Sequence, residues 1–284
     1  MIVNNQPKAT RLWRKASATI TGKLHKEQRN KYGQDRVNYW PDFTNSQSAC
    51  VTMSDGASKA LHAYLGAKYT CSAACDWLVE QLGMDENHLW NLTDQELKIQ
   101  LLDYIRIKLE MARKEVISKQ EQMGEGLVTY PPLSAFSATL LFAITDGKRY
   151  LVGNLGDGIV GTISDDGTEP VQLLGAENGQ VANRTWFCIS PEAADHLHLL
   201  RGELPSDGPI TFFLMTDGSA DCLYDHRNHS FAPALAVMAE WLRRADYTDQ
   251  KISKTIRSTM ERLFTSRTLD DCALAFMRGE VQLL

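Results

Sequence analysis

Strand-like and helix-like segments occur in separate blocks along this 284-residue chain. Short apolar, β-branched runs come first and two long helical segments follow; a second block of strands, two more helices and one closing strand complete the order. Segments that do not alternate between strand and helix favour an antiparallel sheet or sandwich covered by helices over a doubly wound parallel sheet. We therefore expect an α+β fold, in one domain over residues 1–284, because no linker or internal repeat divides the chain.

The expected strands are bounded by turn residues and the expected helices by capping residues. Ser58 is interpreted as the N-cap of a first helix that ends at Gly83, and Thr93 to Glu96 as the capping box of a second. Short turns link the strands over 137–164 and predict an antiparallel meander. Residues 174–207 contain few apolar runs and predict a surface excursion, a candidate flap. The remaining predicted elements are strands over 17–21, 37–40, 210–215 and 272–277 and helices over 232–244 and 249–264.

Composition excludes several classes of partner. A net charge of -5 and an isoelectric point near 5.8 argue against a nucleic-acid-binding surface. No apolar run is long enough to span a bilayer, and the N-terminus lacks the apolar core of a secretory signal, so we expect no membrane partner. The six cysteines are scattered, most of them in apolar runs, which favours free thiols in a reducing cytoplasm.

Aspartates recur where apolar runs end. Asp55, Asp157 and Asp217 each follow such a run and precede a glycine, whereas Asp271 precedes the closing run. Asp-Gly alone is a common turn dipeptide, but strands that share a sheet would bring several of these carboxylates together. Like charges in contact raise one another's pKa unless a hard divalent cation with oxygen ligands offsets the repulsion. With Asp35, the set suits two Mg²⁺ or Mn²⁺ ions that generate a bridging hydroxide for attack on phosphorus.

The order of these motifs resembles the metal-dependent protein phosphatases of the PP2C (PPM) family. The matching motifs are Gln34-Asp35, Ser54-Asp55-Gly56, Ser137-Ala138-Thr139, Gly156-Asp157-Gly158, Thr216-Asp217-Gly218 and Asp270-Asp271. Residues 175–187, and the spacing of Gly22 and His25 before the first motif, are similar to the bacterial branch of the family.

The resemblance implies a β-sandwich flanked by helix pairs that hydrolyses phosphoserine and phosphothreonine in proteins with Mn²⁺ or Mg²⁺. It implies that Asp55 bridges two metal ions and that the Gly56 carbonyl binds the second. It further implies that Asp217 and Asp271 complete the first metal site, that Asp157 binds a third ion, and that Asp35 acts through water. Asp35, Asp55, Asp217 and Asp271 are then the catalytic residues. A phosphorylated protein is the expected substrate, with a Ser/Thr kinase as a plausible partner.

Some positions depart from the family pattern. Gln34 stands where many relatives have Glu, and Cys272 where Asn is frequent. Relatives grip the phosphate with an Arg upstream of the Asp35 motif, and His25, Arg29 and Lys23 compete for that role here. His25 aligns best, although a histidine is as often structural as functional.

Two other functions stay open at this point. A degenerate phosphatase fold could bind a phosphoprotein or kinase without turnover, which the loss of charge at Gln34 favours and the retention of Asp55, Asp217 and Asp271 disfavours. A hydrolase of small phosphoesters is the second alternative. A closed pocket would favour that reading, and an open cleft would favour protein substrates.

Overall fold

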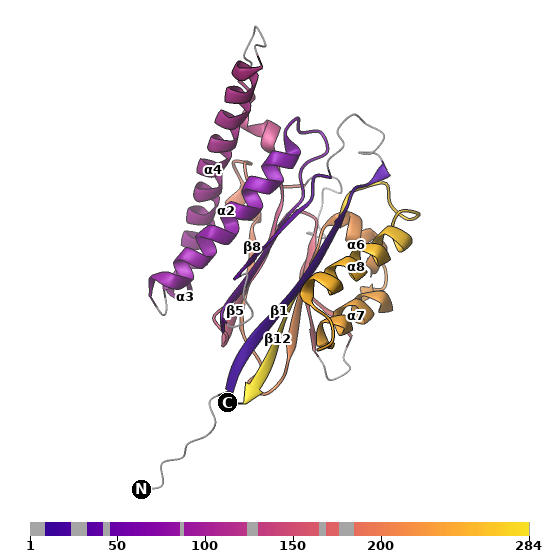
Figure 1. Ribbon diagram of the computed structural model, residues 1–284. Helices are drawn as coiled ribbons and strands as arrows, with labels where there is room; N and C mark the ends of the chain where they lie inside the picture. The colour runs from indigo at the N-terminus through magenta and orange to yellow at the C-terminus, as the bar shows by residue number, and fades with distance from the viewer. Residues whose placement is uncertain are drawn as a thin grey trace.

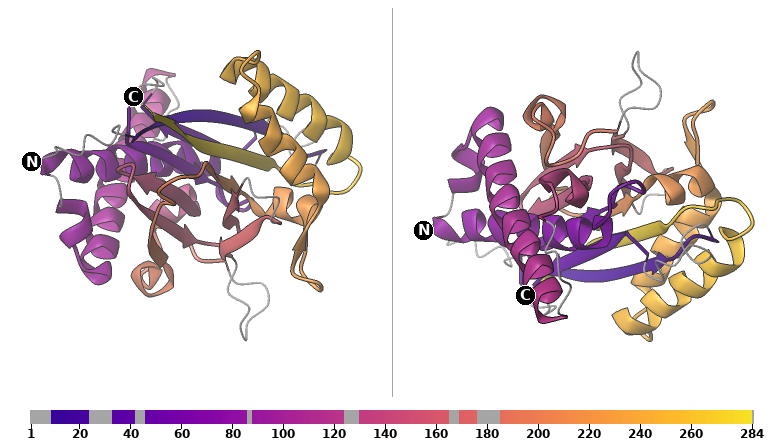
Figure 2. Two further views of the ribbon diagram at one scale, coloured as in Figure 1. Left: turned by 90° about the horizontal axis from the view of Figure 1, so that it is seen from below. Right: turned by 90° about the horizontal axis from the view of Figure 1, so that it is seen from above.

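The computed structural model describes residues 9–23, 33–41, 46–85, 88–123, 130–164, 169–175 and 185–283. Two five-stranded antiparallel sheets pack face to face at its centre, and helices cover the outer face of each sheet (Figures 1 and 2). The predicted α+β sandwich flanked by helix pairs is therefore confirmed. Among the described residues, no helix combines the length and the apolar character that crossing a bilayer requires.

Each sheet mixes strands from distant parts of the sequence. The first sheet has the order β1 (Ala9–Ile20), β12 (Cys272–Leu283), β9 (Ile210–Met215), β6 (Ile159–Ser164) and β7 (Val171–Leu174). The second has the order β2 (Arg36–Trp40), β3 (Ala49–Ser54), β4 (Leu140–Thr145), β5 (Arg149–Leu155) and β8 (His198–Glu203). A short hairpin, β10 (Tyr224–Asp225) and β11 (Ser230–Phe231), stands apart from both.

The helices divide between the two outer faces (Figure 1). The second sheet is covered by α2 (Ala63–Met84), α3 (His88–Asn91) and α4 (Asp94–Gln122), with η1 (Leu133–Phe136) and α5 (Ala193–His196) nearby. The first sheet is covered by α6 (Asp217–Leu223), α7 (Pro233–Glu240), η2 (Trp241–Arg243) and α8 (Asp249–Leu263). The predicted capping box at Thr93 opens α4 with both of its reciprocal hydrogen bonds present.

The central strands read as continuous apolar runs because both of their faces are buried. In β9, Phe212 and Leu214 point between the sheets, whereas Phe213 and Met215 point into the core beneath the helices. Every residue of β3, β4 and β9 is buried. The sandwich is thus held by three apolar layers, one between the sheets and one under each group of helices.

The start of the first long helix was predicted wrongly. Helix α2 begins at Ala63 rather than after Ser58, and Leu61, which a helix starting after Ser58 would include, is 73% exposed. The backbone before it is paired elsewhere: Ala57 N donates to Ser137 O at 2.9 Å and His62 N donates to Ala135 O at 2.8 Å. These tertiary hydrogen bonds hold the segment in a path that local capping preference does not reveal.

The predicted meander over 137–164 is also wrong at its last strand. Strands β4 and β5 pair as expected, but β6 lies in the other sheet, between β9 and β7. The turn at Gly156 carries the chain across, with φ of +129°, a conformation that favours glycine. Asn154 Nδ2 fixes the turn by donating to Gly158 O at 2.9 Å.

Strand pairing extends further than the sequence indicates. Strand β1 begins at Ala9 rather than near residue 17, and it pairs with β12 along the full length of both strands. The 174–207 segment includes β8, which extends the second sheet beside β5. Part of the candidate flap is therefore an edge strand, and residues 176–184 lie outside the described residues.

Candidate active site

Three carboxylates from both sheets converge at one end of the sandwich. Asp55 follows β3, Asp157 lies in the turn after β5, and Asp217 is the first residue of α6, directly after β9. One carboxylate oxygen from each lies within 4.8 Å of the others. The structure thus brings together three predicted metal ligands that are widely separated in sequence.

Asp55 is fixed by the backbone and side chain of Thr139. Asp55 N donates to Thr139 Oγ1 at 3.0 Å, and Thr139 N donates to Asp55 O at 2.8 Å. Ser54 Oγ donates to Thr139 O at 2.6 Å. Gly56 then approaches α2 so closely that a Cβ there would lie 2.6 Å from Ala63 O. Thr139, from the Ser-Ala-Thr motif, therefore fixes the end of β3 through these hydrogen bonds.

Asp157 and Asp217 are each oriented by one close donor. Thr185 Oγ1 donates to Asp157 Oδ2 at 2.7 Å, which ties the end of the candidate flap to this carboxylate. Gly218 N donates to Asp217 Oδ1 at 2.7 Å. In each carboxylate, one oxygen is therefore held by a hydrogen bond, and the other accepts none from the part of the chain that the structure describes.

Asp35 lies beside Asp55 and is 2% exposed. Thr216 Oγ1 donates to Asp35 Oδ2 at 2.8 Å and accepts from Ala273 N at 2.9 Å. The other oxygen, Oδ1, is buried and finds no hydrogen-bond donor among the described residues. The carboxyls of Asp35 and Asp55 lie within hydrogen-bonding reach of each other.

Both carboxylate oxygens of Asp271 accept hydrogen bonds from backbone amides. Its Oδ1 accepts from Gly22 N at 2.7 Å and its Oδ2 accepts from Gln34 N at 2.5 Å, and the side chain is buried. It does not join the group of Asp55, Asp157 and Asp217. Asp271 therefore joins the two ends of the 22–34 loop, and metal binding by it stays a prediction.

The candidate phosphate-binding residues His25 and Arg29 lie outside the described residues. Lys23 is the last described residue before this segment. Arg36, which the sequence analysis did not single out, stacks on Tyr64 with its guanidinium 3.8 Å from the ring centroid. Its Nη1 also donates to the Asp35 carbonyl, so a cation is fixed beside the site.

Burial and neighbouring charges raise the pKa values of Asp35, Asp55 and Asp217. Burial is the largest cause at each of them. It raises the pKa of Asp35 to about 7, with the charge of Asp271 adding to the effect, and that of Asp217 to about 8, with Asp157 adding. The pKa of Asp55 lies well above its usual range, through burial and then the charges of Asp35 and Asp217. Without a cation, the cluster binds protons instead.

Comparison with known proteins decides the family. The sequence model of the family described as protein phosphatase 2C matches residues 21–257. The chain belongs to the protein phosphatase 2C family. No curated protein sequence matches it.

The fold of this phosphatase family member is shared with solved bacterial structures at low sequence identity. A structure described as a bacterial serine phosphatase has a TM-score of 0.54 at 13% identity, over 96% of this chain and 98% of that one. The serine/threonine phosphatase of S. agalactiae has a TM-score of 0.51 at 15% identity, over 93% and 98%. A structure described under the bacterial stressosome has a TM-score of 0.52 at 11% identity, over 93% and 98%. These likenesses confirm the fold.

The donor set fits the divalent metal ions that the family implies. Asp55, Asp157 and Asp217 meet without an ion pair to any described Lys or Arg. The buried Oδ1 of Asp35 has no hydrogen-bond donor among the described residues. Hard oxygen ligands select Mg²⁺ or Mn²⁺ over softer metals. Family and site together support a metal-dependent phosphatase.

Sequence reasoning missed two residues that shape this site. Thr216 and Thr185 orient Asp35 and Asp157 through their hydroxyl groups. Thr216 had a local signal, because it directly precedes Asp217 at the end of a buried strand. Thr185 had none, since 28 residues separate it from its partner.

Proposed function

We propose that this chain hydrolyses phosphoserine and phosphothreonine in proteins, using Mn²⁺ or Mg²⁺ held by the carboxylate cluster. The convergence of Asp55, Asp157 and Asp217 from two sheets, next to the unsatisfied oxygen of Asp35, carries this proposal. A protein that only bound a phosphoprotein would have no need to gather four carboxyls at one place, because their repulsion costs stability.

In this proposal the residues take the roles that the family resemblance implies. Asp55 and the Gly56 carbonyl would hold two ions, Asp217 and Asp271 would complete the first site, and Asp157 would hold a third ion. When bound, the ions supply an activated water and neutralise the charge on the phosphoryl oxygens.

The chain's own groups then orient the water and the substrate. Asp35 accepts from Thr216 through Oδ2, and its Oδ1 has no donor among the described residues, so Oδ1 is the atom that would accept a hydrogen bond from a water molecule in the site. His25 or Arg29 grips the phosphate from the 22–34 loop. The 174–207 segment, tied to Asp157 by Thr185, contributes a flap over the substrate. A Ser/Thr protein kinase is the class of enzyme that supplies such a substrate.

Substrate class is tested by comparing kcat/KM for three phosphomonoesters at saturating Mn²⁺. The substrates are a phosphothreonine peptide, the same peptide with phosphotyrosine, and p-nitrophenyl phosphate. We expect the phosphothreonine peptide to be the best by at least about tenfold, since a protein phosphatase uses contacts beyond the reacting group. Preference for p-nitrophenyl phosphate would instead support the small-molecule phosphoesterase.

A further inference from the structure

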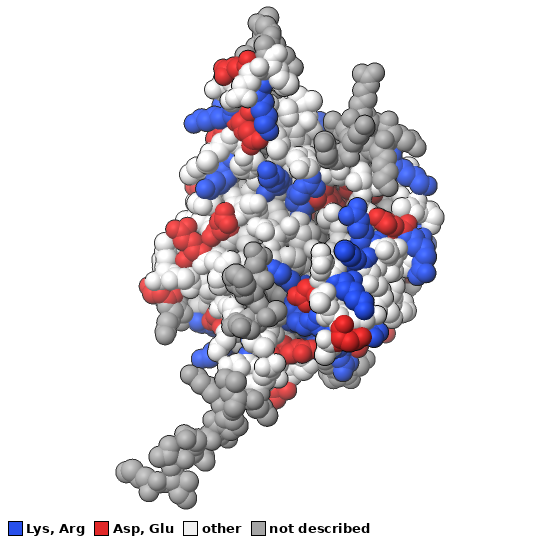
Figure 3. All heavy atoms as spheres, viewed as in Figure 1, with Lys and Arg blue, Asp and Glu red and all other residues white. Residues whose placement is uncertain are grey.

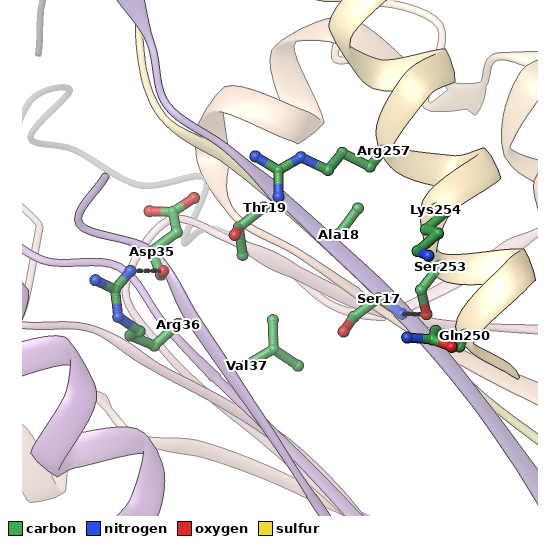
Figure 4. Close-up of a pocket in the computed structure, with 10 residues that line it drawn as sticks. All are labelled: Ser17, Ala18, Thr19, Asp35, Arg36, Val37, Gln250, Ser253, Lys254 and Arg257. Atoms are coloured by element: carbon green, nitrogen blue, oxygen red, sulfur yellow. Dashed lines mark hydrogen bonds between the residues drawn. The ribbon is translucent and has the colours of Figure 1, made fainter. Parts of the chain in front are cut away.

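A polar groove of about 440 Å³ runs between the edges of the two sheets, beside the carboxylate cluster. One wall is β1 at Ser17 and Thr19, another is the start of β2, and the third is α8 (Figure 4). Asp35 lines the groove near one end and also lies against Asp55, so the groove leads from the candidate active site.

Helix α8 turns a polar, cationic face to the groove. Gln250, Ser253, Lys254 and Arg257 follow the spacing of one helix face, and the neighbouring face buries Ile252, Ile256 and Met260. Lys and Arg side chains gather over this part of the molecule in the space-filling view (Figure 3). Amphipathic packing of α8 against β1 therefore fixes where the cations lie.

The two cations of this face keep free hydrogen-bonding capacity. Lys254 makes no ion pair with a described residue. Arg257 pairs with Glu261 through Nε at 3.1 Å, and its two terminal nitrogens donate to no described acceptor. In Figure 4 the Arg257 guanidinium extends over β1 toward the side of the groove where Asp35 lies. Its terminal nitrogens are thus presented to a ligand.

Hydroxyl groups line the groove between the cations. Ser253 Oγ accepts from Ser17 N at 3.2 Å, which leaves its own proton to donate, and the Thr19 side chain lies between Asp35 and Ala18 (Figure 4). The single lining carboxylate, Asp35, is directed to Thr216 and Asp55. Arg36 lies on the opposite wall with its guanidinium held by Tyr64 and the Asp35 carbonyl, so Lys254 and Arg257 are the cations that the groove offers to a ligand. Such a lining suits an anionic ligand.

We propose that this groove binds an anionic side chain of the phosphoprotein substrate, a carboxylate or a second phosphate that flanks the hydrolysed residue. This rests on the proposed phosphatase function and adds a specificity for acidic substrates to it. A peptide that leaves the carboxylate cluster along the groove would meet Arg257 before Lys254 (Figure 4). The cations contribute to substrate selection and take no part in the chemistry.

The test compares three phosphothreonine peptides, with flanking alanines, flanking glutamates or one flanking phosphoserine, on the full chain. We expect the double variant Lys254→Ala/Arg257→Ala to lower kcat/KM for the anionic peptides by about five- to tenfold, as loss of two exposed charge pairs implies. Activity on the alanine peptide should change by less than about twofold, and the effect should shrink at high salt. The glutamate and phosphoserine arms show which anion is preferred. Arg262→Ala, an exposed arginine on the same helix outside the groove, is the matched control.

An equal loss on all three peptides, or no loss on any, would overturn the groove assignment. A separate measurement of peptide binding distinguishes failure of the groove assignment from failure of the phosphatase proposal. Fluorescence anisotropy of the labelled peptides in EDTA should show tighter binding of the anionic peptides, and the double variant should lose that difference. If no peptide is hydrolysed by the unsubstituted chain, this binding difference alone decides the groove, and its absence would refute it.

Discussion

The Thr216 hydroxyl donates to Asp35 Oδ2 at 2.8 Å while it accepts from Ala273 N at 2.9 Å. The amide of Ala273 donates to the Thr216 hydroxyl oxygen, and the hydroxyl proton is donated to Asp35. Thr216 also directly precedes Asp217, so one residue sets the positions of two carboxyls. Orientation of Asp35 thus comes from the junction of β9 and β12 rather than from its own loop.

Replacing Thr216 with valine tests that orientation. Thr216→Val keeps the shape of the side chain but removes the donor to Asp35 and the acceptor for Ala273 N. We expect metal affinity, measured by calorimetry with Mn²⁺, to fall by about 10- to 100-fold, as is typical when a group that orients a metal site is lost. Thr216→Ser retains the hydroxyl and should stay within about threefold of the unsubstituted chain. Equal losses in both variants would point to packing instead.

Asp217→Asn separates metal binding from folding. It removes a carboxyl whose ionised form is disfavoured in the fold by burial and by neighbouring charges, so the metal-free chain should unfold at an equal or higher temperature. Hydrolysis should fall to background, since a predicted metal ligand is lost. Differential scanning calorimetry in EDTA, with the exposed surface variant Asp246→Asn as control, checks the first expectation. A clear loss of stability in Asp217→Asn would contradict this account of the cluster.

The stability of the metal-free chain should fall as pH rises. The pKa is about 7 for Asp35 and about 8 for Asp217 in the fold, whereas both are near 4 in an unfolded chain. Between these values the folded state binds more protons, so the contribution to stability is greatest below pH 4 and is lost as pH rises toward 8. Adding Mn²⁺ should reverse the trend by binding the ionised form. Melting temperatures from pH 5 to 8.5, with and without Mn²⁺, measure this, and parallel curves would contradict it.

Asp271 differs from the cluster in what its oxygens bind. Asp271→Asn would turn an amide N–H toward the backbone N–H of Gly22 or Gln34, leaving a buried donor unsatisfied. We expect a loss of about 1–3 kcal/mol, or a melting temperature lower by about 3–8 °C, even in EDTA. Asp217→Asn, in contrast, should not lower the melting temperature in EDTA. An unchanged melting temperature together with lost Mn²⁺ binding would make Asp271 a metal ligand with no structural role.

The sequence predicted those features of the fold that local patterns determine. Strand β9 was bounded correctly because its apolar run is continuous and Asp217 closes it. The capping box at Thr93 is a local device and was confirmed. The convergence of Asp55, Asp157 and Asp217 followed from their positions at strand ends.

What the sequence could not predict depends on tertiary pairing. The start of α2 is displaced to Ala63 by hydrogen bonds from residues 57 and 62 to the chain around η1. Strand β6 changes sheets because of the backbone conformation at Gly156, and no local pattern distinguishes that turn from a hairpin. The donors to Asp271, Gly22 N and Gln34 N, belong to a loop that has no periodicity.

The central claim is that the carboxylate cluster makes this chain a metal-dependent phosphatase. The most direct measurement is release of phosphate from a phosphothreonine peptide by the purified chain, first with Mn²⁺, then with excess EDTA, then with Mn²⁺ restored. The account predicts turnover that EDTA abolishes and Mn²⁺ restores, and none in Asp217→Asn under any condition. Turnover that survives EDTA, or that persists in Asp217→Asn, would contradict it.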